Sequence, residues 1–506
     1  MMAAASTFFH TVRHLRPAQI YGRLYRPRPR LRLKSGVQLR PPVGAWATTI
    51  PRRSSQIAPN TFCFLNEQRE IRTWNDPEIP KLWLYNLHYL EHPTAELVER
   101  WVAENPPGGG VGWEPYPIAL RMVNLLKWAS NGGALSDAAI NSLDLQAQFL
   151  SQSLEHRLGG NHLLTNAVGL TMAGICLAGF DSDEWLHTGT RLLRRELAEQ
   201  ILPDGAHYER SPMYQALILE HVLNLINAAA LYGSAPPDDR AMWRSKAAAM
   251  LSWLSHMTHP DGDIAFFNDA AFGIAPKVAE LNAYAARLGI APANLPLGSS
   301  GYVRLDVGDT TVLFDGAAIG PNHQPGHAHA DTLSFEISHR GRRVLVNSGT
   351  LTYEKGSDRE WQRGTAAHNT IRIDNMDQSE MWSAFRVGRR ARAFDLRTDG
   401  STFVEAAHDG YTRLPNPVIH RRRLDVSSGD VKVTDRIEGR GQHRVEVFFH
   451  FHPETEPQIQ FDPKLSSSTR SSCWYPHFNM SVPNTTLAGT WSGPCPVEFV
   501  TRIPLS

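Results

Sequence analysis

The stretch Gly326-His-Ala-His-Ala-Asp-Thr-Leu-Ser-Phe335 leads from a loop-like segment into a run in which apolar and polar residues alternate. Such alternation is typical of a half-buried β-strand. From about Pro296 onward the chain repeats this two-residue period, with turn residues such as Ser428-Gly-Asp430 between the runs. We therefore predict an antiparallel β-sandwich over residues 296–506. Its predicted strands are residues 303–307, 311–315, 332–338, 343–347, 370–374, 402–406, 420–426, 431–437 and 445–452.

The chain upstream of this region has a helical pattern. Between about Asp76 and Leu288 apolar residues recur with the period of an α-helix, and short Gly, Pro or Asp turns separate the segments. Consecutive helices with short connections pack as antiparallel hairpins, so we predict a helical domain over residues 76–295. Its predicted helices are residues 95–104 after a Thr94 cap, 136–154 starting at Ser136, 161–177, 183–201, 212–231 and 239–257.

The length also favours two domains, because 506 residues exceed what one hydrophobic core usually supports. The first 53 residues contain many arginines and no acidic residue. We interpret residues 1–75 as a basic segment and linker, with an amphipathic helix over residues 8–24 that docks on the body of the protein. A peripheral anchor to an anionic membrane or polymer is the alternative.

Other features restrict the partners and the compartment. The net charge is +1 and the chain has no motif typical of nucleic-acid binding, so we expect no nucleic-acid partner. No apolar stretch is long enough to span a membrane. The N-terminus lacks the apolar core and the cleavage site of a signal peptide. We therefore expect a cytoplasmic protein, with the periplasm as the alternative.

The quoted stretch also carries chemically active side chains, His327 and His329. Side chains two residues apart on a strand point to the same face, so the pair predicts two imidazoles over one cleft. His368 precedes another predicted strand, and Asn347 lies near the end of one. Because zinc sites need three or four such ligands, this set predicts a metal site or an active site. A cupin is disfavoured, because the first glutamate after the pair is Glu336, which does not fit the cupin spacing.

Two further polar segments stand in the helical half. Gly159-Gly-Asn-His162 opens a predicted helix, where Asn161 is either the helix cap or a neutral donor to a carboxylate at the helix N-terminus. Asp204-Gly-Ala-His-Tyr-Glu-Arg-Ser-Pro-Met-Tyr214 joins a loop to a helix that Ser211 can cap. Its tyrosines, Tyr208 and Tyr214, are either hydrogen-bonded core residues or parts of a site.

Five motifs follow one another along the chain: Gly-Asn-His at 160–162, Ser-Pro-Met-Tyr at 211–214, Gly-His-Ala-His-Ala-Asp at 326–331, Val-Asn-Ser-Gly-Thr at 346–350 and His-Asn-Thr at 368–370. In this order they resemble the motifs of the heparinase II/III family of polysaccharide lyases. The resemblance spans roughly residues 75–455. It implies an incomplete α/α toroid followed by an antiparallel β-sandwich.

The resemblance further implies β-elimination at a uronic acid of an anionic polysaccharide. A donor must first stabilise the negative charge that develops next to the C5 carbon, and by resemblance Asn161 and His162 take this role. Tyr214 matches the main acid/base tyrosine of the family, and His327 matches the catalytic histidine that is its partner. A tyrosine with an ordinary pKa of ~10 needs a cationic neighbour to act as a base at neutral pH.

A structural zinc ion is also implied by the resemblance. His329 and His368 match zinc positions of the family, whereas Asn347 stands where some members carry an aspartate. An amide is a weaker ligand than a carboxylate. The alternative is therefore water or no metal among His329, Asn347 and His368.

Further residues are expected to bind the sugar chain. Aromatic rings stack on sugar rings, and an arginine can pair with a carboxylate or a sulfate; helix packing is the alternative for each aromatic. The candidates are Tyr208, Glu209, Trp113, Arg121, Tyr85 and His88. Asn268 and Asp269 follow two phenylalanines, but the sequence does not place them relative to the cleft.

Two other functions remain open from the sequence. A glycoside hydrolase would need two carboxylates on either side of the bond, for which Asp204, Glu209, Glu114 and Asp269 are available without forming an obvious pair. A polysaccharide-binding or assembly factor would keep the scaffold without the chemistry. The sequence identifies neither the polysaccharide nor the mode of cleavage.

Overall fold

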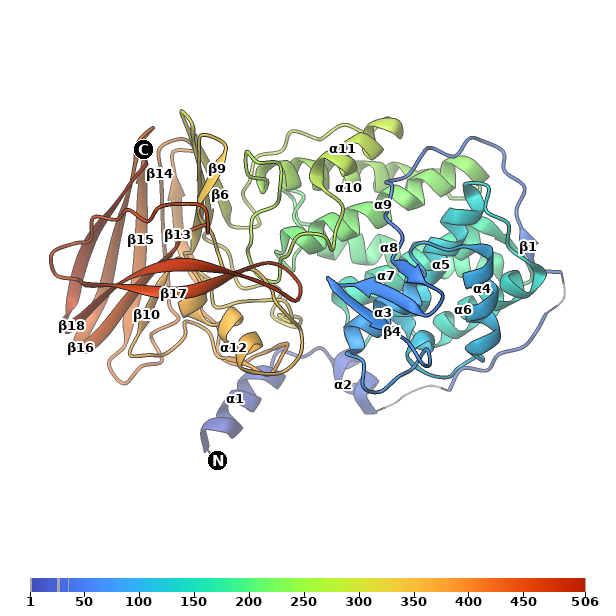
Figure 1. Cartoon of the computed structure of the whole chain (residues 1–506), viewed down its shortest axis with the longest axis horizontal. Coiled ribbons are helices and arrows are strands. Elements are labelled where there is room, and N and C mark those ends of the chain that lie inside the picture. The colour runs from blue at the N-terminus through green and yellow to red at the C-terminus, as the bar shows by residue number, and fades with distance from the viewer. Residues whose placement is uncertain (1, 25–27, 35, 506) are drawn as a thin grey trace.

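The protein has a helical half and a β half, which stand at the right and the left of Figure 1. The computed structural model describes residues 2–24, 28–34 and 36–505. The predicted fold class, helices followed by antiparallel sheets, is confirmed. The exact domain boundaries stay a prediction. No helix in the described ranges is long and apolar enough to cross a membrane.

Helix α7 (Gly160–Cys176) lies at the centre of the helical half. Nearly all of its side chains are buried, and it packs against α5, α8 and α9. A helix that is enclosed on every side and apolar on most of its surface belongs in a core. The other helices of this half are α3 (Lys81–Tyr89), α4 (Ala95–Glu104), the 3-10 turn η1 (Val111–Trp113), α5 (Pro115–Ser130), α6 (Asp137–Gln152), α8 (Ser182–Gln200), α9 (Pro212–Tyr232), α10 (Pro237–His256) and α11 (Val278–Arg287).

Side-chain caps fix where several of these helices begin. Thr94 accepts a hydrogen bond from the N–H of Leu97, and Ser211 accepts one from the N–H of Tyr214, both at 3.2 Å. These predicted helix starts are confirmed. The interpretation of Asn161 as a cap is wrong, because α7 already begins at Gly160 and the side chain of Asn161 bonds elsewhere.

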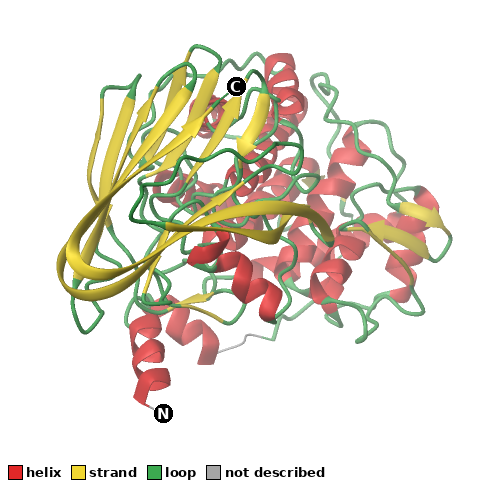
Figure 2. Cartoon of the chain, turned by 60° about the vertical axis from the view of Figure 1, so that its left-hand side comes forward, coloured by secondary structure: helices red, strands yellow, loops and turns green. Residues whose placement is uncertain are grey.

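The β half consists of packed antiparallel sheets (Figure 2). One sheet has the order β6-β7-β8-β9, and another has the order β13-β14-β15-β16-β18-β17 with β10 beside β16. Apolar side chains from both sheets, such as Leu305 and Phe499, belong to one core. The strands are β6 (Tyr302–Val307), β7 (Thr310–Asp315), β8 (Phe335–His339), β9 (Arg342–Leu345), β10 (Ile371–Ile373), β13 (Ala393–Thr398), β14 (Phe403–His408), β15 (Val418–Val426), β16 (Asp430–His450), β17 (Ser466–His477) and β18 (Met480–Pro504).

The structure differs from the predicted strands in several places, and β13 has no counterpart among them. The separate strands expected at 431–437 and 445–452 are one strand, β16, which continues through a register shift between Ile437 and Gly441. Strands β17 and β18 do not follow from the sequence pattern, because the first half of β17 is polar and exposed. The strand expected at 332–338 begins only at Phe335, so the His327–His329 pair lies in the loop before it.

Short elements lie beside the main helices and sheets of each half. β1 (Gln38–Leu39) pairs with β5 (Leu177–Ala178), and β2 (Gln56–Ala58), β3 (Thr61–Phe64) and β4 (Glu67–Glu70) form a sheet beside α3. In the β half, α12 (Ser357–Arg363), the 3-10 turn η2 (Thr365–Ala367) and the hairpin of β11 (Met381–Trp382) and β12 (Arg386–Val387) lie in the connections between strands.

The N-terminal segment carries two helices where the sequence predicts one over residues 8–24. They are α1 (Met2–Val12) and α2 (Pro17–Leu24). The break falls before Pro17, because a proline disfavours helical geometry in the residue that precedes it. The expected docking of this segment on the body of the protein is confirmed, since α1 contacts β12.

Candidate functional site

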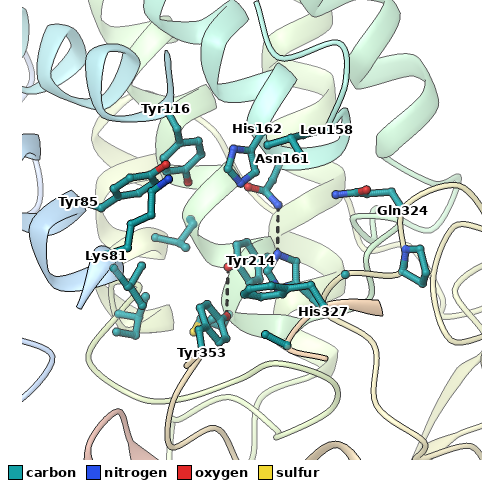
Figure 3. Close-up of a pocket in the computed structure, with 18 of the residues that line it drawn as sticks. Lys81, Tyr85, Tyr116, Leu158, Asn161, His162, Tyr214, Gln324, His327 and Tyr353 are labelled. Carbon is teal, nitrogen blue, oxygen red and sulfur yellow. Dashed lines mark hydrogen bonds between the residues drawn. The ribbon is translucent and has the colours of Figure 1, made fainter. Parts of the chain in front are cut away.

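A cavity of about 1090 Å³ lies between the helical half and loops of the β half. Helices α3, α5, α7 and α9 contribute one side of its wall, and the loops around residues 322–327, 353–355 and 383–390 contribute another. The wall includes the residues predicted to be catalytic, Asn161, His162, Tyr214 and His327 (Figure 3). The structure thus brings together four residues from three separate segments of the chain.

Asn161 is held in the first turn of α7 by Glu209. Its backbone N–H donates to Glu209 Oε1 at 3.0 Å, and its Nδ2 donates to Oε2 at 2.8 Å. Gly160 has a φ of +57°, and a Cβ at this position would lie 2.3 Å from Glu209 Oε1. A glycine is therefore required for the carboxylate to approach the helix. The second hydrogen of Asn161 Nδ2 is directed to His327 Nε2, 3.4 Å away (Figure 3).

Glu209 is buried and ionised. Burial acts to raise its pKa, but His207, His327 and the N–H groups of Asn161 hold the pKa below its ordinary value. Glu209 is not among the residues that line the cavity. The structure therefore corrects its predicted role as a sugar ligand: Glu209 positions Asn161.

His327 is oriented by Asp269. Its Nδ1 lies 2.9 Å from Asp269 Oδ2. Burial acts to raise the pKa of Asp269, but the charge of Arg359 and hydrogen bonds from His327, His329 and Arg359 hold the pKa well below its usual range. An ionised carboxylate only accepts hydrogen bonds, so His327 Nδ1 carries the proton. The free electron pair of Nε2 is then available at the cavity.

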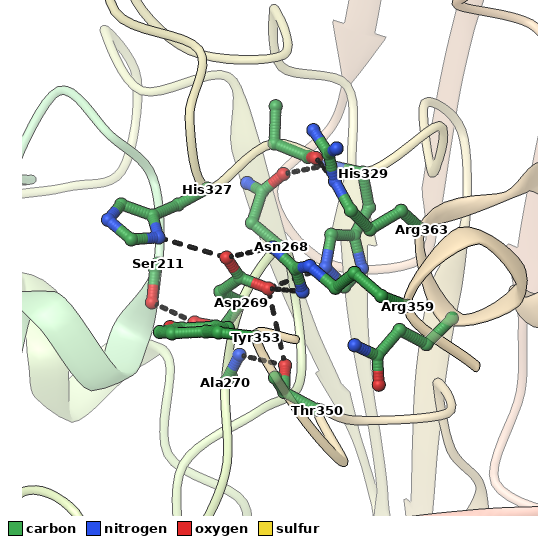
Figure 4. A network of polar contacts seen from close by, with 12 residues as sticks. Ser211, Asn268, Asp269, Ala270, His327, His329, Thr350, Tyr353, Arg359 and Arg363 are labelled. Atoms are coloured by element: carbon green, nitrogen blue, oxygen red, sulfur yellow. Dashed lines mark hydrogen bonds and ion pairs between the residues drawn. The ribbon is translucent and has the colours of Figure 1, made fainter. Parts of the chain in front are cut away.

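The same carboxylate also binds the second histidine of the motif (Figure 4). His329 Nε2 lies 3.0 Å from Asp269 Oδ1, and Arg359 Nη2 donates to Oδ2 at 2.8 Å. The Asp269 backbone N–H donates to the carbonyl of His327 at 3.0 Å. The expectation that both imidazoles face one cleft from a strand is wrong, because both residues precede β8 and their rings contact opposite oxygens of Asp269.

Tyr214 stands beside His327 in the cavity wall. The two ring centroids are 3.9 Å apart, and the Tyr214 hydroxyl lies 3.1 Å from the hydroxyl of Tyr353 (Figure 3). Burial raises the pKa of Tyr214 well above its ordinary value, and the neighbouring Tyr353 acts in the same direction. Arg359 lies over the ring of Tyr353, 4.9 Å from its centroid, and does not offset the raised pKa of Tyr214. Tyr214 is therefore a phenol that holds its proton.

His162 lies in the cavity wall beside a buried carboxylate. Its Nδ1 lies 3.1 Å from Glu155 Oε2, and its ring centroid lies 4.5 Å from that of Tyr116. Burial acts to lower the pKa of His162, but the charge of Glu155 and the hydrogen bond to it outweigh burial and raise the pKa above 6.5. With Asn161 on the same turn, the cavity has two donors suited to a carboxylate.

The proposed zinc residues form only part of a metal site. His329 Nδ1 and His368 Nε2 are 3.1 Å apart. Their other nitrogens donate to acceptors, Asp269 Oδ1 and the carbonyl of Gly364, so two free electron pairs face each other. Asn347, however, donates its Nδ2 to the carbonyl of Phe266 at 2.9 Å.

Zinc needs three or four ligands, and His329 and His368 supply two. Among the residues that the structure describes, no group of three His, Cys, Asp or Glu side chains is arranged to hold a metal ion. The residues present therefore do not fit a complete zinc site, and the predicted zinc stays a prediction. None of the proposed catalytic steps depends on zinc.

The predicted sugar-binding residues divide into two groups. Tyr85 lines the cavity, and its ring stacks near that of Tyr116 at 6.5 Å. Tyr208 is buried and is not part of the cavity wall. The remaining candidates lie in the helical core.

For Trp113, Arg121 and His88 the structure corrects the predicted role. Arg121 is fully buried and donates to Gln146, to the carbonyl of His88 and to the carbonyl of Gly112. His88 and Trp113 are buried and bonded within the same core. Side chains without solvent contact, whose donors are already paired, are unavailable to a polysaccharide.

Sequence reasoning missed three residues of the site: Asp269, Tyr353 and Arg359. Asp269 is noticed in the sequence as a polar residue after two phenylalanines, but nothing there connects it to His327. Tyr353 stands three residues after the Val-Asn-Ser-Gly-Thr motif. This short distance from the motif is the signal that could have identified Tyr353 as a site residue. Arg359 lies in α12, an element that the sequence analysis does not predict.

Comparisons with known proteins identify the family of this chain. The family description "Heparinase II/III N-terminus" matches residues 133–290, and "Heparinase II/III-like, C-terminal" matches residues 291–482. A heparin-sulfate lyase of Bacteroides thetaiotaomicron is 25% identical over 455 residues, covering 79% of this chain and 61% of that protein. A heparin-sulfate lyase of Pedobacter heparinus is 24% identical over 319 residues, covering 55% of this chain and 47% of that protein. The chain thus matches about half to three fifths of the length of these curated relatives.

Solved structures show the same fold at low identity. The crystal structure of heparan sulfate lyase HepC from Pedobacter heparinus has a TM-score of 0.57 at 18% identity, over 88% of this chain and 81% of that one. The crystal structure of heparinase III has a TM-score of 0.62 at 16% identity, over 81% of this chain and 73% of that one. The two family descriptions together cover well over half of the sequence. The chain therefore belongs to the heparinase II/III family.

Proposed function

We propose that this protein is a polysaccharide lyase that cleaves an anionic, uronate-containing polysaccharide by β-elimination. The observation that carries the proposal is the convergence of Asn161, His162, Tyr214 and His327 on one cavity. These four side chains provide the functions that the reaction needs: neutralisation of a carboxylate, a base and an acid. The names of the curated relatives, heparin-sulfate lyases, support the same reaction class.

Carboxylate binding is the first step. The C5 proton of a uronic acid becomes acidic only when the charge that spreads into its carboxylate is stabilised. The cationic ring of His162 and the weakly engaged N–H of Asn161, 3.4 Å from His327, are placed for this task. When the substrate carboxylate accepts a hydrogen bond from that N–H, His327 Nε2 no longer accepts one from Asn161. Its electron pair is then free to take a proton.

Proton removal is assigned to His327. Its Nδ1–H is held by Asp269, so Nε2 has the free electron pair of a base. After it takes the C5 proton, the imidazolium is stabilised by the charge of Asp269 and by Glu209, whose Oε2 lies 3.8 Å from Nε2. The base is thus supported by two buried anions.

Tyr214 supplies the proton for the leaving group. Because burial raises its pKa, the hydroxyl stays protonated until the C4–O4 bond breaks. The electron pair of the C5–H bond forms the C4–C5 double bond, and O4 leaves with the proton of Tyr214. The sequence places both the acid and the base role mainly on Tyr214; here Tyr214 is the acid and His327 is the base. The Tyr353 hydroxyl, 3.1 Å from that of Tyr214, is positioned to return a proton to Tyr214.

The glycoside hydrolase alternative receives less support from the site. Asp269 is buried and occupied by His327, His329 and Arg359, and Glu209 is occupied by Asn161. Asp204 accepts hydrogen bonds from Ser300 and Gly298. Glu114, the fourth candidate, pairs with Lys81 at 2.9 Å. None of the four lines the cavity, whereas a hydrolase needs two carboxylates that face the bond.

The experiment that tests the proposal is a product assay on a panel of acidic polysaccharides. β-Elimination leaves an unsaturated uronate at the new non-reducing end, which absorbs in the ultraviolet. We expect absorbance to rise with at least one uronate polymer and to stay flat with the Tyr214→Phe protein. Saturated products alone, from every polymer that is cleaved, would overturn the proposal.

A further inference from the structure

The two N-terminal helices α1 and α2, here called the N-terminal arm, are fixed to both halves of the molecule (Figures 1 and 2). Directly before α2, Arg16 forms an ion pair with Glu199 of the helical half. Gln19 is buried and donates to the carbonyl of His323 at 3.0 Å. The arm therefore crosses from α8 to the loop that carries the catalytic histidine.

The first helix of the arm is attached to the β11–β12 hairpin. Thr11 Oγ1 donates to the carbonyl of Val387 at 3.1 Å and accepts from Trp382 Nε1 at 3.0 Å. Arg389 donates to Ser6 Oγ at 2.7 Å. These contacts join residues far apart in the sequence, so the position of α1 is specific.

The arm forms part of the wall of the catalytic cavity. Phe8, Thr11, Leu15 and Arg23 line the same cavity as His327. The sequence-based interpretation gave this segment a docking role, with a peripheral anchor to an anionic membrane or polymer as the alternative. Its contribution to the cavity indicates a role in substrate binding.

Three arginines meet on this side of the cavity: Arg23 from the arm, and Arg386 and Arg390 from the hairpin and the loop that follows it. In the described part of the chain, none of the three has a carboxylate oxygen within 4.0 Å. Two other cations in the same wall are paired: Arg52 with Glu91 at 3.2 Å, and Lys81 with Glu114 at 2.9 Å.

Arg23 lies near Arg386, whereas Arg390 lies near Arg13 and donates to Asn322. Burial and the positive charges of Arg386 and Arg157 lower the pKa of Arg23. Burial and the charge of Arg13 lower the pKa of Arg390 to about 10. Like charges gathered without a counter-charge destabilise a folded protein unless an anion joins them.

We propose that Arg23, Arg386 and Arg390 form a subsite for an acidic group of the saccharide chain, a sulfate or a carboxylate. The planar guanidinium groups present the paired donors that such anions accept. Arg386 is held by the ring of Trp382, 5.1 Å from its centroid, which reduces the conformational freedom lost on binding. The subsite rests on the proposed function in that it lies in the same cavity, and it makes the N-terminal arm part of the binding site.

The test measures binding separately from turnover. In the Tyr214→Phe background, the affinity is measured for a fluorescently labelled heparin tetrasaccharide and for its desulfated form. Adding Arg23→Gln and Arg386→Gln together should raise Kd by about tenfold or more for at least one probe. The matched control is Arg30→Gln, an exposed arginine of the same segment outside the cavity wall, which should change Kd by less than about twofold.

The pattern of loss identifies the acidic group. A loss confined to the sulfated probe indicates sulfate, and an equal loss with both probes indicates carboxylate. Unchanged Kd for both probes, or no binding of either probe by the Tyr214→Phe protein, would overturn the subsite. If the wild-type protein forms unsaturated product and the arginine variant binds both probes normally, the subsite is wrong and the lyase proposal stands. If the arginine variant binds weakly and the wild-type protein forms no unsaturated product, the lyase proposal is wrong and the subsite stands. Unchanged thermal unfolding of the variants excludes misfolding as the cause.

Discussion

Asp269 Oδ2 and His327 Nδ1 are 2.9 Å apart, and this contact fixes which nitrogen of His327 is free to act. The carboxylate is kept ionised by Arg359, whose Nη2 donates to the same oxygen at 2.8 Å. The sequence separates the two partners by 58 positions. The geometry therefore gives His327 the properties of a base before any substrate arrives.

Replacing Asp269 by Asn should remove this control. The asparagine amide would either donate an N–H to His327 Nδ1 or accept a hydrogen bond from it without a negative charge. Either change alters which nitrogen of His327 carries the proton and how basic Nε2 is. We expect kcat to fall by about 10²–10⁴-fold. Removing one partner of a buried ion pair also destabilises a protein by about 3–5 kcal/mol, which thermal unfolding will report.

Asp435→Asn is the matched control for that loss of stability. Asp435 is a buried carboxylate in the β half that binds His420 Nε2 at 2.7 Å and Arg422 Nη2 at 3.0 Å. Its replacement should lower the melting temperature but leave kcat of the folded protein unchanged. If Asp269→Asn lost no more activity than Asp435→Asn, the role given to Asp269 would be wrong.

Tyr214→Phe removes the proposed acid while keeping the ring against His327. The rate should fall by about 10²–10⁴-fold, and KM should change little. Tyr411→Phe removes a buried hydroxyl that donates to the carbonyl of Ile371 at 2.7 Å, outside the cavity wall, and should leave the rate near that of the wild type. A Tyr214→Phe protein with ordinary turnover would exclude this residue as the acid.

The pH dependence follows from the raised pKa of His162. The imidazolium binds the substrate carboxylate in the proposal, so activity is present while His162 is protonated and is lost as the pH rises through its pKa. Because Glu155 raises that pKa above 6.5, kcat/KM should decline only on the alkaline side of this value. His162→Gln should lower kcat/KM and remove this alkaline limb; an unchanged pH profile in that variant would contradict the assignment.

Removing any bound metal tests whether a metal has a structural role or takes part in the reaction. Neither His329 nor His368 lines the cavity, and the proposed steps use none of the zinc residues as an acid or a base. Dialysis against a chelator should therefore leave kcat unchanged, and any effect should appear in the melting temperature. Loss of activity that zinc restores would show that a metal takes part in the reaction.

The sequence predicts best the features that local residues determine. Thr94 and Ser211 start helices where a hydroxyl cap is expected, and the change from a helical to a two-residue period separates the two halves correctly. The three-residue spacing within Ser-Pro-Met-Tyr214 places that tyrosine at the start of α9, where it does face the cavity. Such signals lie within a few residues of the feature that they predict.

Features that depend on long-range contacts escape sequence reasoning. Asn161 looks like a cap, and its contact with Glu209 depends on a loop 48 residues away. Arg121 looks like a ligand for a carboxylate, but its donors are consumed inside the helical core. The arm is visible as a basic segment, whereas its place in the cavity wall depends on a hairpin 376 residues away.

The most direct test of the central claim is the mass of the products from a defined uronate oligosaccharide. β-Elimination breaks the C4–O4 bond without consuming water, so the masses of the two fragments should add up to the mass of the substrate, with one fragment unsaturated. Hydrolysis adds one water to the sum. Fragments that add up to the mass of the substrate alone are the result that we predict, and fragments that together carry one additional water would contradict the assignment of this cavity to a lyase.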